Sequence, residues 1–278
     1  MRDAPRDALI GDIVATGQRG AAYGLRQALD TVGAFTGPLL AITLMATFND
    51  NFRLVFWLAA IPATIAVVIL VAGVREPPSE SRTARLPLRF RDLKTIGAGY
   101  WIVVGAGAAL TLARFSEAFL ILRAQNAGLP LALAPLVLVV MNIVYSAAAY
   151  PLGALSDRVD RKLMLGAGFA VLIAADGVLA LAPSLTIVTI GVALWGLHMA
   201  VTQGLMSALV ADSAPQHLRA TAFGFFNFAG GVALLLASVI AGFLWQQIGP
   251  SATFVAGAAF TSLGLLTMFV TRHANPVW

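Results

Sequence analysis

The sequence contains no cysteine and only three histidines, His198, His217 and His273, in 278 residues. Without cysteine there is no disulfide framework, no iron–sulfur cluster and no thiolate zinc site, and the histidines are too far apart in sequence to suggest a ligand pair. The HExxH and GxSxG motifs of zinc proteases and serine hydrolases are also absent. The sequence therefore predicts that the protein binds no metal or other cofactor and that it is not an enzyme.

Charged residues are scarce as well. Asp, Glu, Lys and Arg make up 11% of the chain, whereas the apolar set AVILMFWYC reaches 59%. A soluble domain carries about 25% charged residues, so this chain has too few polar groups to cover a water-facing surface. The composition excludes an ordinary soluble domain and predicts that the lipid bilayer is the main partner of its surface.

Eight apolar stretches are long enough to cross a bilayer as helices. Backbone polar groups in lipid must bond within their own segment, and the alternating pattern of a barrel strand is absent, so we expect an all-α polytopic membrane protein. The expected spans are 21–47, 53–74, 96–122, 131–155, 163–182, 185–210, 221–245 and 252–270.

The basic residues predict the topology. Fourteen of the 18 Lys and Arg residues fall in the connections on one side, two fall on the other side and two lie within spans. Because cytoplasmic loops collect positive charge, we expect a multi-pass protein of the inner (plasma) membrane with both termini in the cytoplasm. This topology accounts for the net charge of +5, so the sequence predicts no nucleic-acid partner.

The connections divide the chain into five expected parts. Residues 1–20 are expected to form a cytoplasmic loop, and 21–74 two helices of a first bundle. The Arg-rich stretch 75–95 is expected to be a cytoplasmic central linker. Residues 96–271 are expected to form a six-helix bundle that ends in a cytoplasmic tail, 272–278.

The chain contains an internal repeat at an offset of 200 residues. RGAAYGL at 19–25 aligns with RATAFGF at 219–225, and both segments open an expected span. Transporters are often built from repeated bundles, so this offset predicts two related halves of about 200 residues each.

Two further motifs resemble a known family. The run Gly153-Ala-Leu-Ser-Asp157-Arg158-Val-Asp160-Arg161-Lys162 is similar to the G-x-x-x-D-R-x-G-R-K/R loop of the major facilitator superfamily, with Asp160 where that family has glycine. The run Gly24-x8-Gly33-x3-Gly37-Pro38 is similar to the antiporter motif of the family's fifth helix, with Ala41 and Ile42 in place of the final small pair.

The resemblance implies a family-type helical bundle that functions by alternating access. Members have twelve helices in two halves, so about eight transmembrane helices correspond to the last two of the N-terminal half and the complete C-terminal half. Helices one to four are then expected to be missing from an N-terminally truncated chain. The implied function is transport of a small-molecule substrate by a monomer, as efflux by antiport with protons, driven by the proton gradient. Alternatives are metabolite uptake by symport or uniport, and a truncated membrane fragment that does not transport.

Each motif has two interpretations. The motif at 153–162 is either a gate or an anchor. As a gate, it would form charge pairs in one state and break them in another, using Asp157, Arg158, Arg161 and Lys162; as an anchor, it would be a positively charged loop on the cytoplasmic side. The motif at 24–38 is either a pivot or a reflection of composition. As a pivot, it would allow close helix approach at Gly24, Gly33 and Gly37 and bending at Pro38; otherwise its glycines reflect the general abundance of glycine in membrane helices.

Polar residues inside the spans are the candidates for contact with protons or substrate, because burying them in lipid is costly. Arg114 and Glu117 are expected to share one helix face, either as a neutralising pair or as a carboxylate that accepts a proton or a cationic substrate while the arginine tunes its pKa. Asp176 is a second candidate proton site, or a water-exposed helix end.

Three further span residues could face the transport path. His198 is expected either to titrate or to bond a neighbouring helix. Asn142 and Tyr145 either line a cavity or bond another helix. Near the basic end of the first span, Arg26 and Asp30 are spaced for an i,i+4 ion pair.

Overall fold

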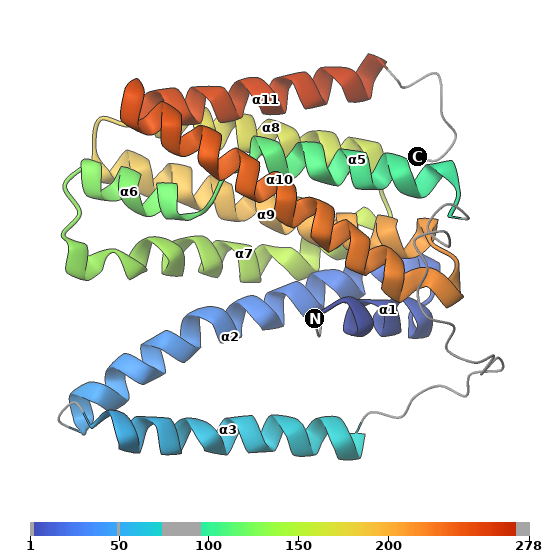
Figure 1. Cartoon of the computed structure of the whole chain (residues 1–278), viewed down its shortest axis with the longest axis horizontal. Coiled ribbons are helices and arrows are strands. Elements are labelled where there is room, and N and C mark those ends of the chain that lie inside the picture. The colour runs from blue at the N-terminus through green and yellow to red at the C-terminus, as the bar shows by residue number, and fades with distance from the viewer. Residues whose placement is uncertain (1–2, 49–50, 74–95, 271–278) are drawn as a thin grey trace. The chain divides into compact units, whose positions relative to one another are not determined.

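The computed structural model describes residues 3–48, 51–73 and 96–270. All the regular structure in these ranges is helical (Figure 1). The α-helices are α1 Asp3–Ile13, α2 Arg19–Thr47, α3 Phe52–Gly73, α5 Ala98–Ala113, α6 Ala118–Asn126, α7 Pro135–Ser156, α8 Arg161–Leu181, α9 Leu185–Ser213, α10 Arg219–Gln247 and α11 Pro250–Val270. Short 3-10 turns are η1 Thr16–Gln18, η2 Leu131–Leu133 and η3 Gln216–Leu218.

The predicted all-α membrane architecture is confirmed. In the described part of the chain, seven helical segments are long and apolar enough to cross a membrane, and α11 contributes a shorter apolar stretch, Pro250–Leu266. These eight segments correspond to the eight stretches expected from the sequence. The expected linker 75–95 and tail 272–278 lie outside the described residues.

The chain divides into two compact units. One comprises residues 1–32 together with 89–278, and the other comprises residues 33–88. The first unit therefore contains α1, the beginning of α2 and all of α5 to α11, and every contact described below lies within it.

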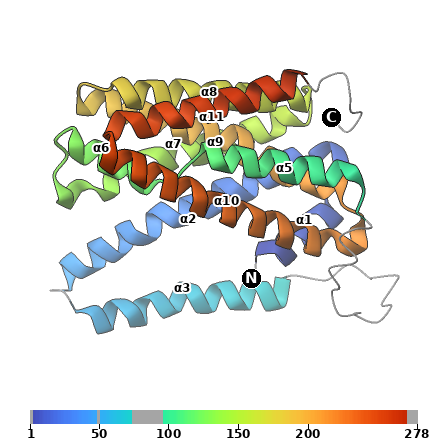
Figure 2. The ribbon, with the colours of Figure 1, turned by 45° about the horizontal axis from the view of Figure 1, so that its top comes forward.

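Helix α9 is the centre of the first unit. It packs against α7 and α8 along much of its length and also contacts α5, α10 and α1 (Figures 1 and 2). Its sequence is apolar on all sides, as expected for a helix enclosed by other helices, and Trp195 and His198 are fully buried. Helix α11 packs on α8 and α5, and α10 packs on α5 and α1.

Helix α10 shows how the sequence separates the core from lipid. Its alanines at four-residue spacing, Ala233, Ala237 and Ala241, are buried and allow neighbouring helices to approach closely. Phe228, Leu235, Val239 and Phe243 are 63–66% exposed. Such an apolar stripe would be unfavourable in water but is favourable against lipid acyl chains.

Two sequence-based expectations about local structure are wrong. Residues 3–13 form a helix, where residues 1–20 were expected to be loop, and this helix packs against α10 and α9. Its charges interrupt any apolar run, which hid it from a search for spans. The expected continuous helix 96–122 is broken between α5 and α6, with Arg114 in an extended conformation at φ −108° and ψ 98°.

Candidate functional site

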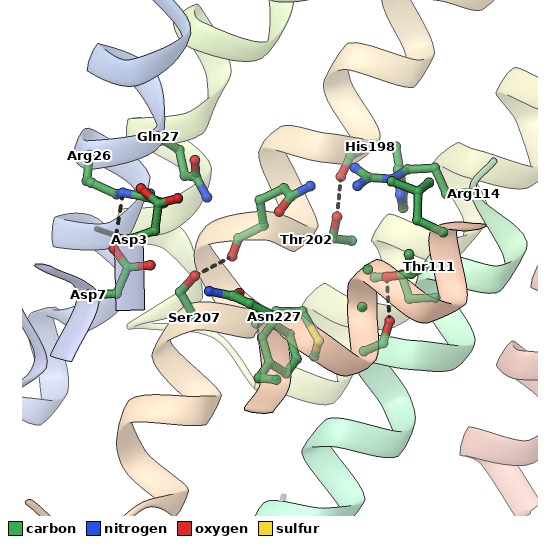
Figure 3. Close-up of a pocket in the computed structure, with 18 residues that line it drawn as sticks. Asp3, Asp7, Arg26, Gln27, Thr111, Arg114, His198, Thr202, Ser207 and Asn227 are labelled. Carbon is green, nitrogen blue, oxygen red and sulfur yellow. Dashed lines mark hydrogen bonds and ion pairs between the residues drawn. The ribbon is translucent and has the colours of Figure 1, made fainter. Parts of the chain in front are cut away.

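A polar cavity of about 430 Å³ lies inside the first unit, lined by α1, α2, α5, α9 and α10 together with Arg114 after α5 (Figure 3). Its walls combine charged and amide side chains with hydroxyls. The polar lining residues are Asp3, Asp7, Arg26, Gln27, Thr111, Arg114, His198, Thr202, Gln203, Ser207 and Asn227. Polar groups concentrated within apolar helices are the expected chemistry of a solute path, because in lipid they would be left without partners.

The break between α5 and α6 positions Arg114 in this cavity. Gln203 of α9 lies opposite, and its amide oxygen accepts from Nη1 of Arg114 at 2.6 Å and from Nη2 at 3.0 Å in the amide orientation that satisfies both groups. The described residues hold no Arg114–Glu117 ion pair, because the helical face that would have aligned these two side chains is interrupted. Irregular backbone at membrane depth is tolerated where it lines a cavity, as it does here.

His198 forms another part of the cavity wall and is fully buried. Its Nδ1 lies 2.8 Å from the backbone oxygen of Gly168 in α8. A carbonyl only accepts hydrogen bonds, so Nδ1 carries the proton in this contact. Thr202, one turn further along α9, donates to the His198 carbonyl at 2.9 Å (Figure 3).

The other end of the cavity is acidic and ion-paired. Asp7 of α1 forms ion pairs with Arg26 at 3.3 Å and with Arg6 at 3.5 Å, and its side chain is 7% exposed. Burial raises the pKa of the Asp7 carboxyl to about 6, although the neighbouring Arg6 acts in the opposite direction. The predicted Arg26–Asp30 pair is confirmed at 3.2 Å.

Four charged residues join the two sequence repeats at the basic end of the bundle. Arg219 pairs with Asp12, and Arg19 pairs with Asp212. Each member of one pair is 200 positions from its counterpart in the other, so the aspartate of each repeat pairs with the arginine of the other repeat. The backbone contacts are also equivalent but lie within each repeat, since Arg19 donates to the Gly11 oxygen at 2.7 Å and Arg219 to the Ala211 oxygen at 3.1 Å.

The motif at 153–162 contributes to the same end in a way that its sequence did not indicate. Asp157 accepts from the backbone amides of Gly20 and Ala21, both at 2.8 Å, and so satisfies free donors in the first turn of α2. Arg161 pairs with Asp212, which thereby receives two guanidinium groups.

The remaining polar members of this motif act locally. Asp160 caps α8 by accepting from the Lys162 and Leu163 amides at 2.8 and 3.0 Å. Its φ of −53° suits any residue, so the family's glycine is not required at this position. The side chains of Arg158 and Lys162 form no ion pair with a described residue.

Gly24 and Gly153 allow α2 and α7 to touch. A Cβ atom at Gly24 would overlap the Ala149 backbone oxygen, and one at Gly153 would overlap the Gly20 backbone oxygen. Gly24 therefore serves the close approach expected of it, and Gly153 serves the same contact from α7, which was not predicted. Gly33, Gly37 and Pro38 belong to the second unit, where α2 continues as a helix through all three positions.

The other candidates lie outside the cavity. Asp176 of α8 is fully buried, and neither carboxyl oxygen has a hydrogen-bond partner among the described residues. A Cβ atom at Gly257 of α11 would lie 2.6 Å from its Oδ2. Tyr145 is buried and Asn142 half-buried on α7, and Glu117 is half-buried at the start of α6; none of the three lines the cavity.

Sequence reasoning missed most of the residues that close the basic end. Asp12, Asp212 and the pairing roles of Arg19 and Arg219 were not predicted, and neither were Asp7 and Gln203 as cavity residues. The repeat contained a usable signal, because extending the alignment seven positions before Arg19 and Arg219 places Asp12 over Asp212.

Comparison with known proteins agrees with the fold. The family model of the Major Facilitator Superfamily matches residues 2–141 and 96–277. An uncharacterised MFS-type transporter of Methanocaldococcus jannaschii is 32% identical over 278 residues, covering 97% of this chain and 68% of the relative.

Two solved structures share the fold at low sequence identity. The human organic anion transporter MFSD10 matches with a TM-score of 0.75 and 15% identity over 95% of this chain and 67% of its own. The Escherichia coli fucose:proton symporter FucP matches with a TM-score of 0.77 and 13% identity over 98% of this chain and 73% of its own. By its family match, its relatives and its helical architecture, this chain belongs to the major facilitator superfamily of membrane transporters.

Proposed function

We propose that the chain carries a small molecule across the inner membrane by alternating access, in the direction of efflux and in exchange for protons. The observation that carries this proposal is the pair of reciprocal ion pairs, Asp12–Arg219 and Asp212–Arg19, at the basic end of a polar cavity. Contacts that tie one repeat to the other at one end must break if that end is to open.

The charged groups of these pairs are suited to separate and re-form. The side chains of Asp12 and Asp212 are 24% and 19% exposed, so water can take over part of their solvation when the guanidinium groups move away. The guanidinium groups of Arg19 and Arg219 are buried, with side chains 11% and 9% exposed, so breaking a pair without a new partner would leave a buried charge. Such a contact can exist in one state and be lost in another when water or other groups take over the charges that it releases.

Two carboxyl groups are candidates for proton exchange. Asp176 is buried without a hydrogen-bond partner among the described residues, and its surroundings include Gly257 of α11. Glu117 lies at the break between α5 and α6 and acts electrostatically on Arg114. A carboxyl at membrane depth that gains and loses a proton would change the stability of the packing around it.

The direction and orientation rest on sequence features. The similarity of residues 24–38 to an antiporter motif supports efflux. The concentration of Arg and Lys at the end that carries the reciprocal pairs supports a cytoplasmic position for that end, with both termini on the same side.

Everted membrane vesicles that contain the native protein test the proposal. Respiration acidifies their interior, and a pH-sensitive dye reports the gradient while a panel of small molecules is added from outside. An exported substrate enters the vesicles in exchange for protons and dissipates the gradient. Glu117→Gln and Asp176→Asn should each be tested for loss of this signal, with Asp160→Asn, a local helix cap, as the matched control.

Opposite results separate the alternatives. If compounds loaded inside the vesicles leave together with protons, the protein is a symporter for uptake. If a labelled substrate equilibrates across the membrane without changing the gradient, it is a uniporter. If no compound of a broad panel moves in the native protein, transport by this chain is contradicted.

A further inference from the structure

Arg114 is a permanently charged group at membrane depth, and the cost of burying it has to be offset by its surroundings. It lies where the backbone of the third span leaves the helix, and it lines the 430 Å³ cavity. Its neighbours therefore show whether the charge is already neutralised by the protein.

Among the residues that the structure describes, Arg114 contacts an amide but no carboxylate. Both terminal nitrogens point at the Gln203 oxygen, which is neutral. Glu117 and Tyr145 act on Arg114 electrostatically, yet no described carboxylate lies within ion-pair distance of its guanidinium. His198, on the facing helix, adds no negative charge.

Three other arginines of the same unit are satisfied differently. Arg26 is paired with Asp7 and Asp30, and Arg6 with Asp3, Asp7 and Asp30. Arg123 of α6 donates to the backbone oxygens of Leu179 and Ala182, both at 2.8 Å, and to Asn126 at 2.9 Å. Compared with these three, Arg114 donates to a neutral amide oxygen, and Glu117 acts on its charge without forming an ion pair among the described residues.

The rest of the cavity indicates what kind of anion would fit. Beyond the polar groups, its lining includes the apolar side chains Leu110, Met206, Phe226 and Leu234. The acidic groups at the other end are already engaged by Arg6 and Arg26, so they leave little field to attract a cation. A ligand with one negative group and an apolar body would match both surfaces.

We infer that Arg114 binds the carboxylate of an organic anion whose apolar part contacts Leu110, Met206, Phe226 and Leu234. This inference rests on the proposed transport function, since it names the substrate class of the same cavity. A planar guanidinium presents parallel donors that match a carboxylate, and Gln203, which accepts from both terminal nitrogens, holds that plane in place.

Binding to the purified native protein tests the inference without any transport assay. Phenylacetate, phenylacetamide and phenethylamine have nearly the same size and differ in charge, so their effects on the thermal unfolding midpoint compare an anion, a neutral molecule and a cation. The carboxylate should raise the midpoint more than the amide or the amine. Equal shifts for the three, including no shift from any, or a larger shift from the amine, would overturn the inference.

Variants locate the effect. Arg114→Gln should weaken phenylacetate binding by about ten- to a hundredfold and leave any binding of phenylacetamide unchanged. Arg114→Lys keeps the charge but loses the planar donors, so it should retain a reduced preference for the carboxylate. The matched control is Arg123→Lys, which perturbs a neighbouring buried arginine outside the cavity and should preserve the preference.

The two proposals can fail separately. Undiminished binding of phenylacetate to folded Arg114→Gln would contradict the anion site and leave transport by alternating access untouched. Transport of a cationic compound in vesicles would have the same meaning. Selective carboxylate binding without any flux would support the site and contradict the transport proposal.

Discussion

Asp12 and Arg219 form an ion pair across 207 positions of sequence, and their counterparts 200 positions away, Asp212 and Arg19, form another with the roles of the repeats exchanged. The two repeats thus hold each other through equivalent residues. Because both pairs lie at the end where Asp157 meets the first turn of α2, the contacts that close this end are concentrated in one place.

Breaking either pair should make the cavity more accessible from the basic end. The chain has no cysteine, so Ser207→Cys introduces a single reporter in the cavity wall. Asp212→Asn should increase the rate at which a membrane-impermeant maleimide labels this cysteine, and by more than Asp12→Asn does, because Asp212 engages two arginines. Labelling rates unchanged in both variants, with Asp160→Asn as the reference, would show that the pairs do not close this end.

Removing the Asp157 carboxylate should destabilise the protein and loosen α2 from α7. Asp157→Ala leaves the Gly20 and Ala21 amides without their acceptor, at a cost of about 0.5–2 kcal/mol by analogy with helix caps. Asp160→Ala removes a cap of α8 at similar cost. The thermal unfolding midpoint should fall in both variants. The rate of maleimide labelling at Ser207→Cys should rise only when it is combined with Asp157→Ala. A rise of the same size in Asp160→Ala would assign the effect to general destabilisation.

A methyl group at Gly153 should force α2 and α7 apart. Gly153→Ala would place its Cβ against the Gly20 backbone, which cannot yield as a side chain can, so we expect a loss of about 1–3 kcal/mol. Gly224→Ala in α10 is the matched control, because no heavy atom lies within 4 Å of the added Cβ. Urea or thermal unfolding in detergent measures both. Equal stability of the two variants would mean that the contact between α2 and α7 is not tight.

Asp7 should make stability depend on pH over a defined window. Burial gives its carboxyl a pKa of about 6 in the folded protein, well above the ordinary value of an aspartate, so the folded state holds this proton more tightly. The stabilisation is complete below pH of about 4 and is lost as pH rises through about 6. Asp7→Asn cannot lose a proton, so its unfolding midpoint relative to the native protein should rise between pH of about 4 and about 6 and then level off.

The control for this measurement is Asp30→Asn, which changes the more exposed of the two carboxylates that pair with Arg26. A midpoint difference between Asp7→Asn and the native protein that stays flat or falls over the same window would contradict the assignment to Asp7.

Apolar run length predicted most of the fold, because lipid imposes helices of nearly fixed length on any segment that crosses it. It failed for residues 3–13, because three of the charged side chains there, Arg6, Asp7 and Asp12, pair with residues of other helices that no local pattern contains. It also failed at Arg114, since apolar residues continue on both sides of the break. There the turn is favoured by long-range contacts: Phe115 packs on Trp195 and Phe254, with ring centroids 5.2 and 5.3 Å apart.

The candidate site was only partly predictable for a related reason. Arg114 and His198 could be found from sequence because a charged or titratable residue inside an apolar run is conspicuous. The partner of Asp157 could not, because it is a pair of backbone amides more than 130 positions away. Asp12 and Arg219 lie outside the expected spans, where charged residues are common and single ones carry no signal.

The most direct test of alternating access is the distance between the two repeats at the basic end. Thr16 and Gln216 are exposed counterparts 200 positions apart, and in this cysteine-free chain both can be replaced by cysteine and spin-labelled. Pulsed electron paramagnetic resonance should give one short distance population in the native protein. Asp12→Asn/Asp212→Asn should add a longer population, as a transported substrate should. A single unchanged distance under all three conditions would contradict opening at this end.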